Sequence, residues 1–155
     1  MAYAQTTAVP IDRSKAEIEK VLRRHGSEGF GYMSQGGNAL VIFQFRKIPF
    51  RIEVKMPEIG EFERTPRGRS RRGQAIEREY EQACRSKWRA LLLVIMAKLE
   101  AVEQGISTIE HEFAADIVTE SGKTLGQVLD KQLAVGKFKA LPMFTGDFSG
   151  EAEKS

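Results

Sequence analysis

The chain has 155 residues, of which 41% are hydrophobic and 29% are charged, and its net charge at neutral pH is +3. This composition is ordinary for a globular protein and predicts one domain with a real hydrophobic core. The longest apolar run, at residues 90–97, is far shorter than the ~20 residues that span a bilayer, so we expect no membrane partner.

The single cysteine and the first residues indicate the compartment. Cys84 excludes an internal disulfide, and it lies on the apolar side of a predicted helix, where we expect it to be buried and inert. The opening MAYAQTTA has neither the basic region nor the apolar core of a signal peptide. We therefore expect a protein of the cytoplasm.

The N-terminal third predicts one helix and then a sheet. Residues 1–11 are expected to form a loose arm, and Asp12 is expected to cap an amphipathic helix that ends at about His25, before Gly26. Three strands follow, at residues 30–35, 39–45 and 48–56. The turns between them are too short for a crossover, so the strands should form an antiparallel meander. Pro49 indicates that the third strand lies at an edge.

The middle of the chain predicts a long loop and a long helix. Residues 57–73 carry many charges, three glycines and two prolines, and connections of this length in compact domains are usually functional or disordered. Residues 74–104 then repeat apolar side chains at spacings of four and three. Their middle, ALLLVIMA, is apolar on all sides, which predicts a central helix that is buried all round.

The C-terminal part predicts two further helices. Ser107 and Glu110 resemble a capping box, which would open a helix through Phe113 and Ile117. Thr124 is expected to cap a last helix, and residues 141–155 read as a polar tail. The sequence thus predicts an α+β fold in one domain, residues 1–140. A three-stranded antiparallel sheet would pack on a long central helix, with N- and C-terminal helices flanking it.

The most informative motif is the stretch RTPRGRSRR at residues 64–72, which holds five arginines and no acidic residue. Arginines crowded on a short loop repel one another unless an anion lies opposite, and phosphate oxygens match the planar guanidinium group. Residues 1–98 carry a net charge of +8 and residues 99–155 one of −5, which suggests one anion-binding face. We therefore expect a nucleic-acid interface, and the expected contacts are Arg64, Arg67, Arg69, Arg71 and Arg72, with Arg46, Lys47 and Arg51 from the sheet.

One other interpretation of this loop stays open, and two further groups of residues could extend the patch. The arginines could instead pair with the acidic residues just before them, Glu58, Glu61 and Glu63, in a solvated loop. The helical residues Arg78, Arg85, Lys87 and Arg89 could extend the patch. Aromatic side chains on the predicted strands could stack bases beside it, although residues such as Phe43 and Phe50 more often fill a core.

Catalytic and metal-binding patterns are weak in this chain. Glu53 and Lys55 at the end of an alternating strand resemble the E-x-K pair of Mg²⁺-dependent nucleases, but the preceding strand lacks the second acid that such a site needs. His25 and His111 are too few for a metal site with Asp116 or its neighbours. Gly122-Lys123-Thr124 lacks the upstream glycine of a phosphate-binding P-loop. We expect a non-enzymatic protein without a cofactor.

Several segments resemble a family of small uncharacterised proteins of tailed phages and prophages. They are MAYAQ at residues 1–5, the loop 64–72, EQACR at 81–85, WRAL at 88–91, AKLEAV at 97–102 and GISTIE at 105–110. This resemblance implies a phage accessory protein in the cytoplasm of a bacterial host, binding nucleic acid, with DNA as the first expectation. The alternative is a counter-defence inhibitor that uses the same arginines to bind a host protein such as a CRISPR effector. Oligomeric state is left open.

Overall fold

The computed structural model describes residues 7–136 and Phe138, and it has the α+β architecture that the sequence predicts. Helix α2, Ile11–Arg24, leads into three strands, β1 (Gly29–Gln35), β2 (Asn38–Phe45) and β3 (Ile48–Lys55). A short 3₁₀ helix, η1 (Ile59–Phe62), precedes the long helix α3 (Gln74–Glu103). The chain then forms the short helices α4 (Ile109–Glu112) and η2 (Ala114–Asp116), followed by α5 (Leu125–Val135).

The sheet is an antiparallel meander in the order β1-β2-β3, as predicted. Gly36 and Gly37 both have positive φ, which a two-residue hairpin turn requires. The second turn is made by Arg46 and Lys47, which adopt positive φ angles of 47° and 65° although neither is glycine. Pro49 lies on an edge strand, as predicted, because among the described residues β3 pairs with β2 alone, apart from single bridges.

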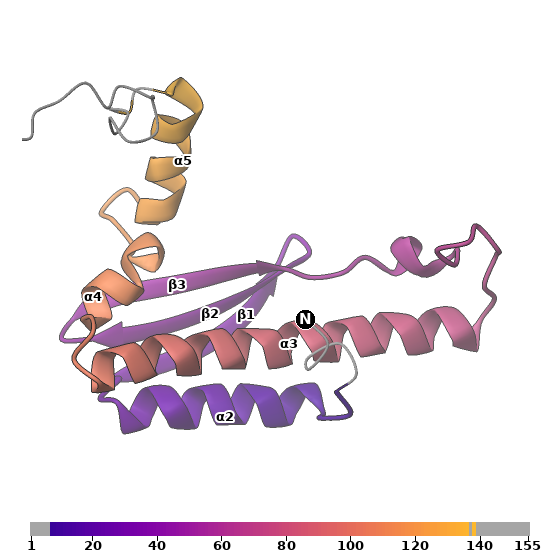
Figure 1. The fold of residues 1–155 in the computed structure, drawn as a ribbon, viewed down its shortest axis with the longest axis horizontal. Coiled ribbons are helices and arrows are strands. Elements are labelled where there is room, and N and C mark those ends of the chain that lie inside the picture. Colours follow the sequence, from indigo (N-terminus) through magenta and orange to yellow (C-terminus); the bar gives the residue numbers. More distant parts are fainter. Residues whose placement is uncertain (1–6, 137, 139–155) are drawn as a thin grey trace, which may run out of the picture.

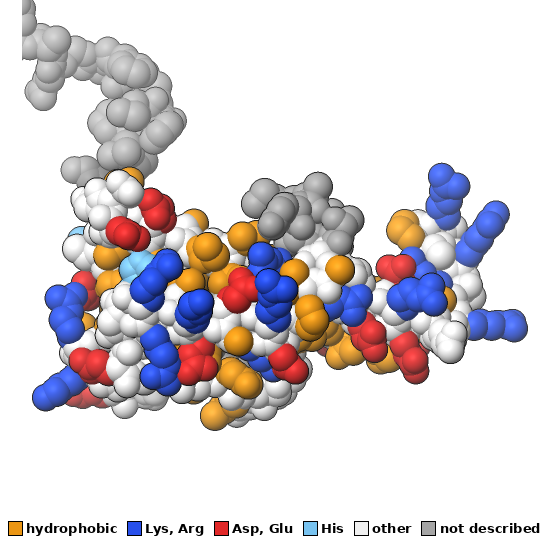
Figure 2. All heavy atoms as spheres, turned by 90° about the horizontal axis from the view of Figure 1, so that it is seen from below, with side chains coloured by type: hydrophobic (Ala, Val, Ile, Leu, Met, Phe, Trp, Pro, Cys, Tyr) orange, Lys and Arg blue, Asp and Glu red, His pale blue; other side chains and the backbone are white. Residues whose placement is uncertain are grey.

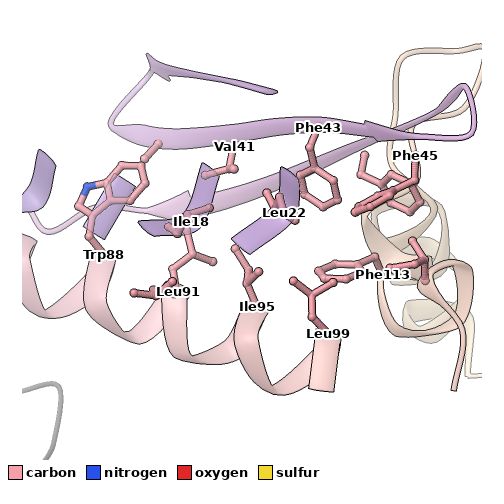
Figure 3. Close-up of a cluster of buried hydrophobic side chains, with 14 residues drawn as sticks. Ile18, Leu22, Val41, Phe43, Phe45, Trp88, Leu91, Ile95, Leu99 and Phe113 are labelled. Atoms are coloured by element: carbon pink, nitrogen blue, oxygen red, sulfur yellow. The ribbon is translucent and has the colours of Figure 1, made fainter. Parts of the chain in front are cut away.

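One face of the sheet is covered by α2 and α3, which lie side by side beneath it (Figure 1). Strand alternation directs Val41, Phe43 and Phe45 of β2 into this layer, where each is at most 4% exposed. Phe43 stacks on Phe50 with ring centroids 5.2 Å apart, and Phe113 meets Phe43 edge to face at 5.4 Å (Figure 3). The helical side of the core is Ile18, Leu22, Trp88, Leu91, Leu92, Ile95 and Leu99.

Helix α3 is central but not buried all round, which corrects the sequence prediction. Leu92 and Ile95 are fully buried, whereas Val94 is 50% and Met96 is 44% exposed. The apolar run ALLLVIMA therefore places only part of its circumference against the sheet and α2. Cys84 is buried, as predicted, on the inward side of the same helix.

Helix α3 also extends beyond the rest of the fold. None of its first ten residues is buried, since the first buried side chain is Cys84. Ten helical residues correspond to ~15 Å. This N-terminal stretch of α3 and the connection from β3 form an arm that projects from one end of the molecule (Figure 1).

Three boundaries differ from the sequence predictions. Helix α2 begins at Ile11, so Asp12 lies in its first turn and the N-cap position is Pro10. Thr108, not Ser107, caps α4, because its hydroxyl accepts a hydrogen bond from the N–H of His111. The helix predicted through Ile117 ends at Glu112, since Ile117 instead bridges to Phe50 on the edge of β3.

Helix α5 is capped by Thr124 as predicted, in a capping box with Gln127. Gly126 packs closely on η2, where a Cβ atom would lie 3.0 Å from the carbonyl oxygen of Ala115. The predicted tail, residues 141–155, lies outside the described residues. Residues 1–6 of the predicted loose N-terminal segment, residues 1–11, lie outside them as well.

Candidate nucleic-acid interface

The arginine loop, residues 64–72, folds into a closed hairpin at the end of the arm. Thr65 accepts a backbone hydrogen bond from the N–H of Gly68 at 2.8 Å, and its own N–H donates to the carbonyl of Arg69 at 2.7 Å. Gly68 has a φ of +78°, the left-handed conformation that follows a type I turn in a three-residue hairpin loop. Pro66 presets the φ of the turn. The sequence TPRG therefore closes the loop through local backbone chemistry.

Arg71 points back into the loop. Its guanidinium Nη1 donates to the carbonyl oxygen of Arg64 at 3.0 Å and to that of Phe62 at 3.4 Å, and its backbone N–H donates to Glu63 at 2.7 Å. It is half-buried, whereas the other four arginines of the loop are exposed. One of the five predicted phosphate contacts thus holds the hairpin shut.

The base of the hairpin is fixed to α3 by aromatic packing. Phe62 meets Tyr80 edge to face, with ring centroids 6.3 Å apart. The neighbouring Cys84 thiol raises the pKa of the Tyr80 hydroxyl. A capping box between Glu58 and Glu61 stabilises η1, the turn that carries Phe62. The loop is therefore held on a structured support.

The guanidinium groups of the four exposed arginines of the hairpin, which we call the tip arginines, have no partner within the described part of the chain. The predicted alternative, pairing with Glu58, Glu61 or Glu63, is not seen among those residues. Figure 2 shows basic side chains that splay outward at the end of the molecule that carries the loop. The tip arginines are Arg64, Arg67, Arg69 and Arg72.

Several arginines elsewhere in the fold form ion pairs. Arg13 and Arg23 each pair with a glutamate one helical turn away, at 3.1 and 2.8 Å. Arg89 reaches across from α3 to Glu17 of α2 at 3.1 Å. The tip therefore concentrates positive charge that forms no ion pair among residues 7–136.

The potential at the tip is raised further by helix α3. Its N-terminus follows directly after Arg72, and the aligned peptide dipoles place ~+0.5 elementary charge there. Two guanidinium groups ~10 Å apart in water repel each other by ~0.4 kcal/mol, so a cluster of four stores a measurable repulsion at low salt. An anion held between the tip arginines would relieve it.

The part of the arm that is formed by η1 and the facing stretch of α3, in contrast, has mixed charge. A groove of about 680 Å³ between η1 and α3 is lined by Lys55 and Lys87 but also by Glu61 and Glu79. Carboxylates beside the groove repel a phosphate backbone. This distribution confines the strongly positive surface to the tip.

The structure does not bring the predicted sheet contacts together with the arginine loop. Arg46 and Lys47 form the turn at the start of β3, whereas the loop follows its end, and eight strand residues span ~25 Å. Arg46 pairs with Glu110 of α4, and the backbone N–H of Lys47 donates to Glu28 at 3.3 Å. The pKa of Glu110 is lowered by a backbone hydrogen bond at its own residue and by Arg46.

Arg51 lies on the face of β3 that points away from α2 and α3, where it is half-buried and its guanidinium donates to the side chain of Gln127 at 3.4 Å. It therefore connects the sheet to α5. On α3, Arg85 is likewise engaged, with Gln82 at 2.8 Å and Glu81 at 3.7 Å. Because Arg85 and Arg89 are engaged in contacts within the fold, they do not extend the basic patch along α3 as expected.

The E-x-K pair lies on the open face of the edge strand. Glu53 accepts a hydrogen bond from the side-chain amide of Asn38 at 2.7 Å, and both Glu53 and Lys55 are exposed. Within residues 7–136, no group of three or more His, Cys, Asp or Glu side chains is placed to hold a metal ion. His25 instead contacts the carbonyl of Val21 at 2.9 Å.

Most of the aromatic residues on the strands belong to the core, which is the more frequent role of such residues. Phe43, Phe45 and Phe50 are at most 4% exposed and cannot stack on bases. Tyr32 is the exception, with 51% exposure, and the Nζ of Lys15 lies 4.5 Å from its ring centroid. It lies on β1 and is not part of the arm.

Comparison with known proteins gives no further information about the site. The chain matches no family model, no curated protein and no solved structure. Among the helices that the structure describes, none is long and apolar enough to cross a membrane.

Proposed function

We propose that this protein is a non-enzymatic nucleic-acid-binding protein that contacts the phosphate backbone with its tip arginines. The observation that carries the proposal is that the guanidinium groups of Arg64, Arg67, Arg69 and Arg72 are exposed and form no ion pair with the part of the chain that the structure describes, on a hairpin that Arg71 closes from within. A loop that is already closed loses less conformational entropy on binding. More of the electrostatic attraction therefore appears as affinity.

The chemistry of the tip favours binding without sequence preference. Besides arginine, the loop holds only Thr65, Pro66, Gly68 and Ser70, so it lacks the Asn and Gln amides that read adenine and the aromatic rings that stack on bases. Phosphate contacts position a protein on nucleic acid but carry no sequence information. DNA is the first candidate ligand. The resemblance to phage proteins would place this activity in phage DNA metabolism within the bacterial cytoplasm.

Fluorescence anisotropy with labelled single- and double-stranded DNA and RNA tests this proposal. A variant with all four tip arginines changed to alanine should lose most of its binding to every ligand that the wild type binds. A matched control removes four exposed cations elsewhere, at Lys20, Arg24, Lys123 and Lys131. If the control loses as much affinity as the tip variant, the tip has no special role. If the wild type binds none of the ligands, the proposal is wrong.

A protein partner is the second candidate, and one observation favours it. Helix α5 carries a stripe of apolar side chains at helical spacing, Leu125, Val128, Leu129 and Leu133, each between 40% and 52% exposed. An amphipathic helix of this kind suits a groove on another protein. The partner would be a host protein such as a CRISPR effector, and inhibition of the purified effector that is lost in Leu129→Asp would support this function over the first.

A further inference from the structure

The two edges of the sheet differ in how they are protected. Strand β3 carries Pro49 at its second position and is bridged by Ile117, while the N–H of Val118 donates to the carbonyl of Pro49 at 2.9 Å. Its open face also carries Arg51, Glu53 and Lys55. Proline, charge and a covering segment are the usual means by which a protein prevents strand addition.

Strand β1, at the other edge, has none of these features. Its sequence GFGYMSQ contains no charge and no proline, and its last four residues are all exposed. Within residues 7–136, β1 pairs only with β2, and no backbone hydrogen bond from another segment reaches its outer edge. Tyr32 and Met33 are 51% and 52% exposed. An uncharged, unpaired edge of seven residues is a template for another strand.

The side chains of β1 are arranged so that the strand complements itself. If two copies pair in antiparallel fashion with Tyr32 opposite Tyr32, Gly31 faces Met33, Phe30 faces Ser34, and Gly29 faces Gln35. Each of these pairs sets a larger side chain against a smaller one, and the two tyrosines meet at the two-fold axis. Aromatic cross-strand pairs stabilise antiparallel sheets.

No charge on the paired strands themselves opposes this pairing. Neither β1 nor its neighbour β2 carries a charged residue. The cation beside the edge, Lys15, has its Nζ 4.5 Å from the ring of Tyr32 and 4.9 Å from the ring of Trp88, so it is held beneath its own sheet.

We propose that β1 is a dimerisation edge, at which a second copy of this chain adds antiparallel to form a continuous six-stranded sheet with Tyr32 on the two-fold axis. The interface is isologous, as in most homodimers. Because β3 runs parallel to β1 and leads into the arm, the arms of the two copies emerge at opposite ends of the joined sheet. The proposal does not depend on what the tip arginines bind.

Sedimentation of the full chain and cysteine cross-linking test the edge and its register. The wild type should sediment at twice the 17.4 kDa of one chain. Directly opposed residues of antiparallel strands have Cα atoms ~4.5–5.5 Å apart, within disulfide range. Tyr32→Cys should therefore form an intermolecular disulfide on oxidation. Ser34→Cys should form roughly tenfold less, because its two copies would be ~13 Å apart in this register. Cys84 is buried in both variants.

A charge variant provides the complementary test. Tyr32→Glu places a carboxylate beside Lys15 of its own chain, which favours folding, but it also sets two carboxylates face to face across the axis. The dimer dissociation constant should rise at least ~4-fold relative to Ser34→Glu, whose carboxylate would face Phe30. A monomeric wild type overturns the proposal, as does equal cross-linking at positions 32 and 34. A monomer whose amides 30–34 resist hydrogen exchange would show that another segment of the same chain covers the edge.

Discussion

Replacing Arg71 with alanine should loosen the arginine loop, because this side chain holds the hairpin shut. It makes one hydrogen bond of 3.0 Å and a second, weaker one of 3.4 Å to backbone carbonyls. A charged donor contributes ~1.5–3 kcal/mol in a buried site, and half-exposure reduces this to ~1 kcal/mol here. That value corresponds to about a fivefold change in the opening equilibrium of the loop.

Two measurements check this magnitude. Amide hydrogen exchange at Thr65 and at position 71, whose backbone N–H groups donate within the hairpin, should accelerate about fivefold in the variant. The melting temperature should fall by ~2–4 °C, as expected for ~1 kcal/mol in a chain of this size. Arg72→Ala removes the same charge without a hydrogen bond and should change neither quantity. Identical behaviour of the two variants would refute the structural role of Arg71.

Three further predictions concern the core, the E-x-K pair and pH. Ile95→Asp should prevent folding, since an unpaired charge in a fully buried position costs several kcal/mol, whereas Val94→Asp on the exposed side of α3 should melt cooperatively in circular dichroism. Glu53→Ala should leave nucleic-acid binding unchanged, and Mg²⁺-dependent cleavage by the wild type that this variant abolishes would contradict the non-enzymatic account. Burial raises the pKa of Asp116, and the positive charge of Lys98 opposes this shift. The protonated carboxyl therefore stabilises the fold in acid, and this stabilisation is lost as the pH rises through the raised pKa. Asp116→Asn should therefore raise the melting temperature at pH 7 but not below the ordinary pKa of 3.8, and an equal effect at both pH values would count against it.

Local patterns were sufficient to predict much of the fold. The glycine pair at 36–37 and the alternation of β3 predict the meander, because turn conformation and side-chain direction depend on a few neighbouring residues. The period of apolar residues likewise predicts α3. Periodicity does not say how many faces of a helix find partners, so the exposure of Val94 and Met96 could not be foreseen.

Tertiary contacts explain the remaining differences. The helix expected through Ile117 stops because this residue bridges to Phe50, which lies far away in sequence. Within the candidate site, the sequence predicts that the arginines of the loop lie together. It does not predict that Arg71 has a different role from the other four. The inward direction of Arg71 depends on the hairpin that Pro66 and Gly68 create, and the motif TPRG was the signal that could have indicated such a turn.

The salt dependence of nucleic-acid binding tests the central claim most directly. For each phosphate that a protein neutralises on duplex DNA, the slope of log K against log salt concentration steepens by ~0.9. If the four tip arginines contact phosphates, replacing them with alanine should flatten the slope by up to ~3.6. The variant should also lose the same affinity for nucleic acids of unrelated sequence, with little change in its melting temperature. A wild type and a variant with the same slope, or a variant that melts far below the wild type, would contradict the account.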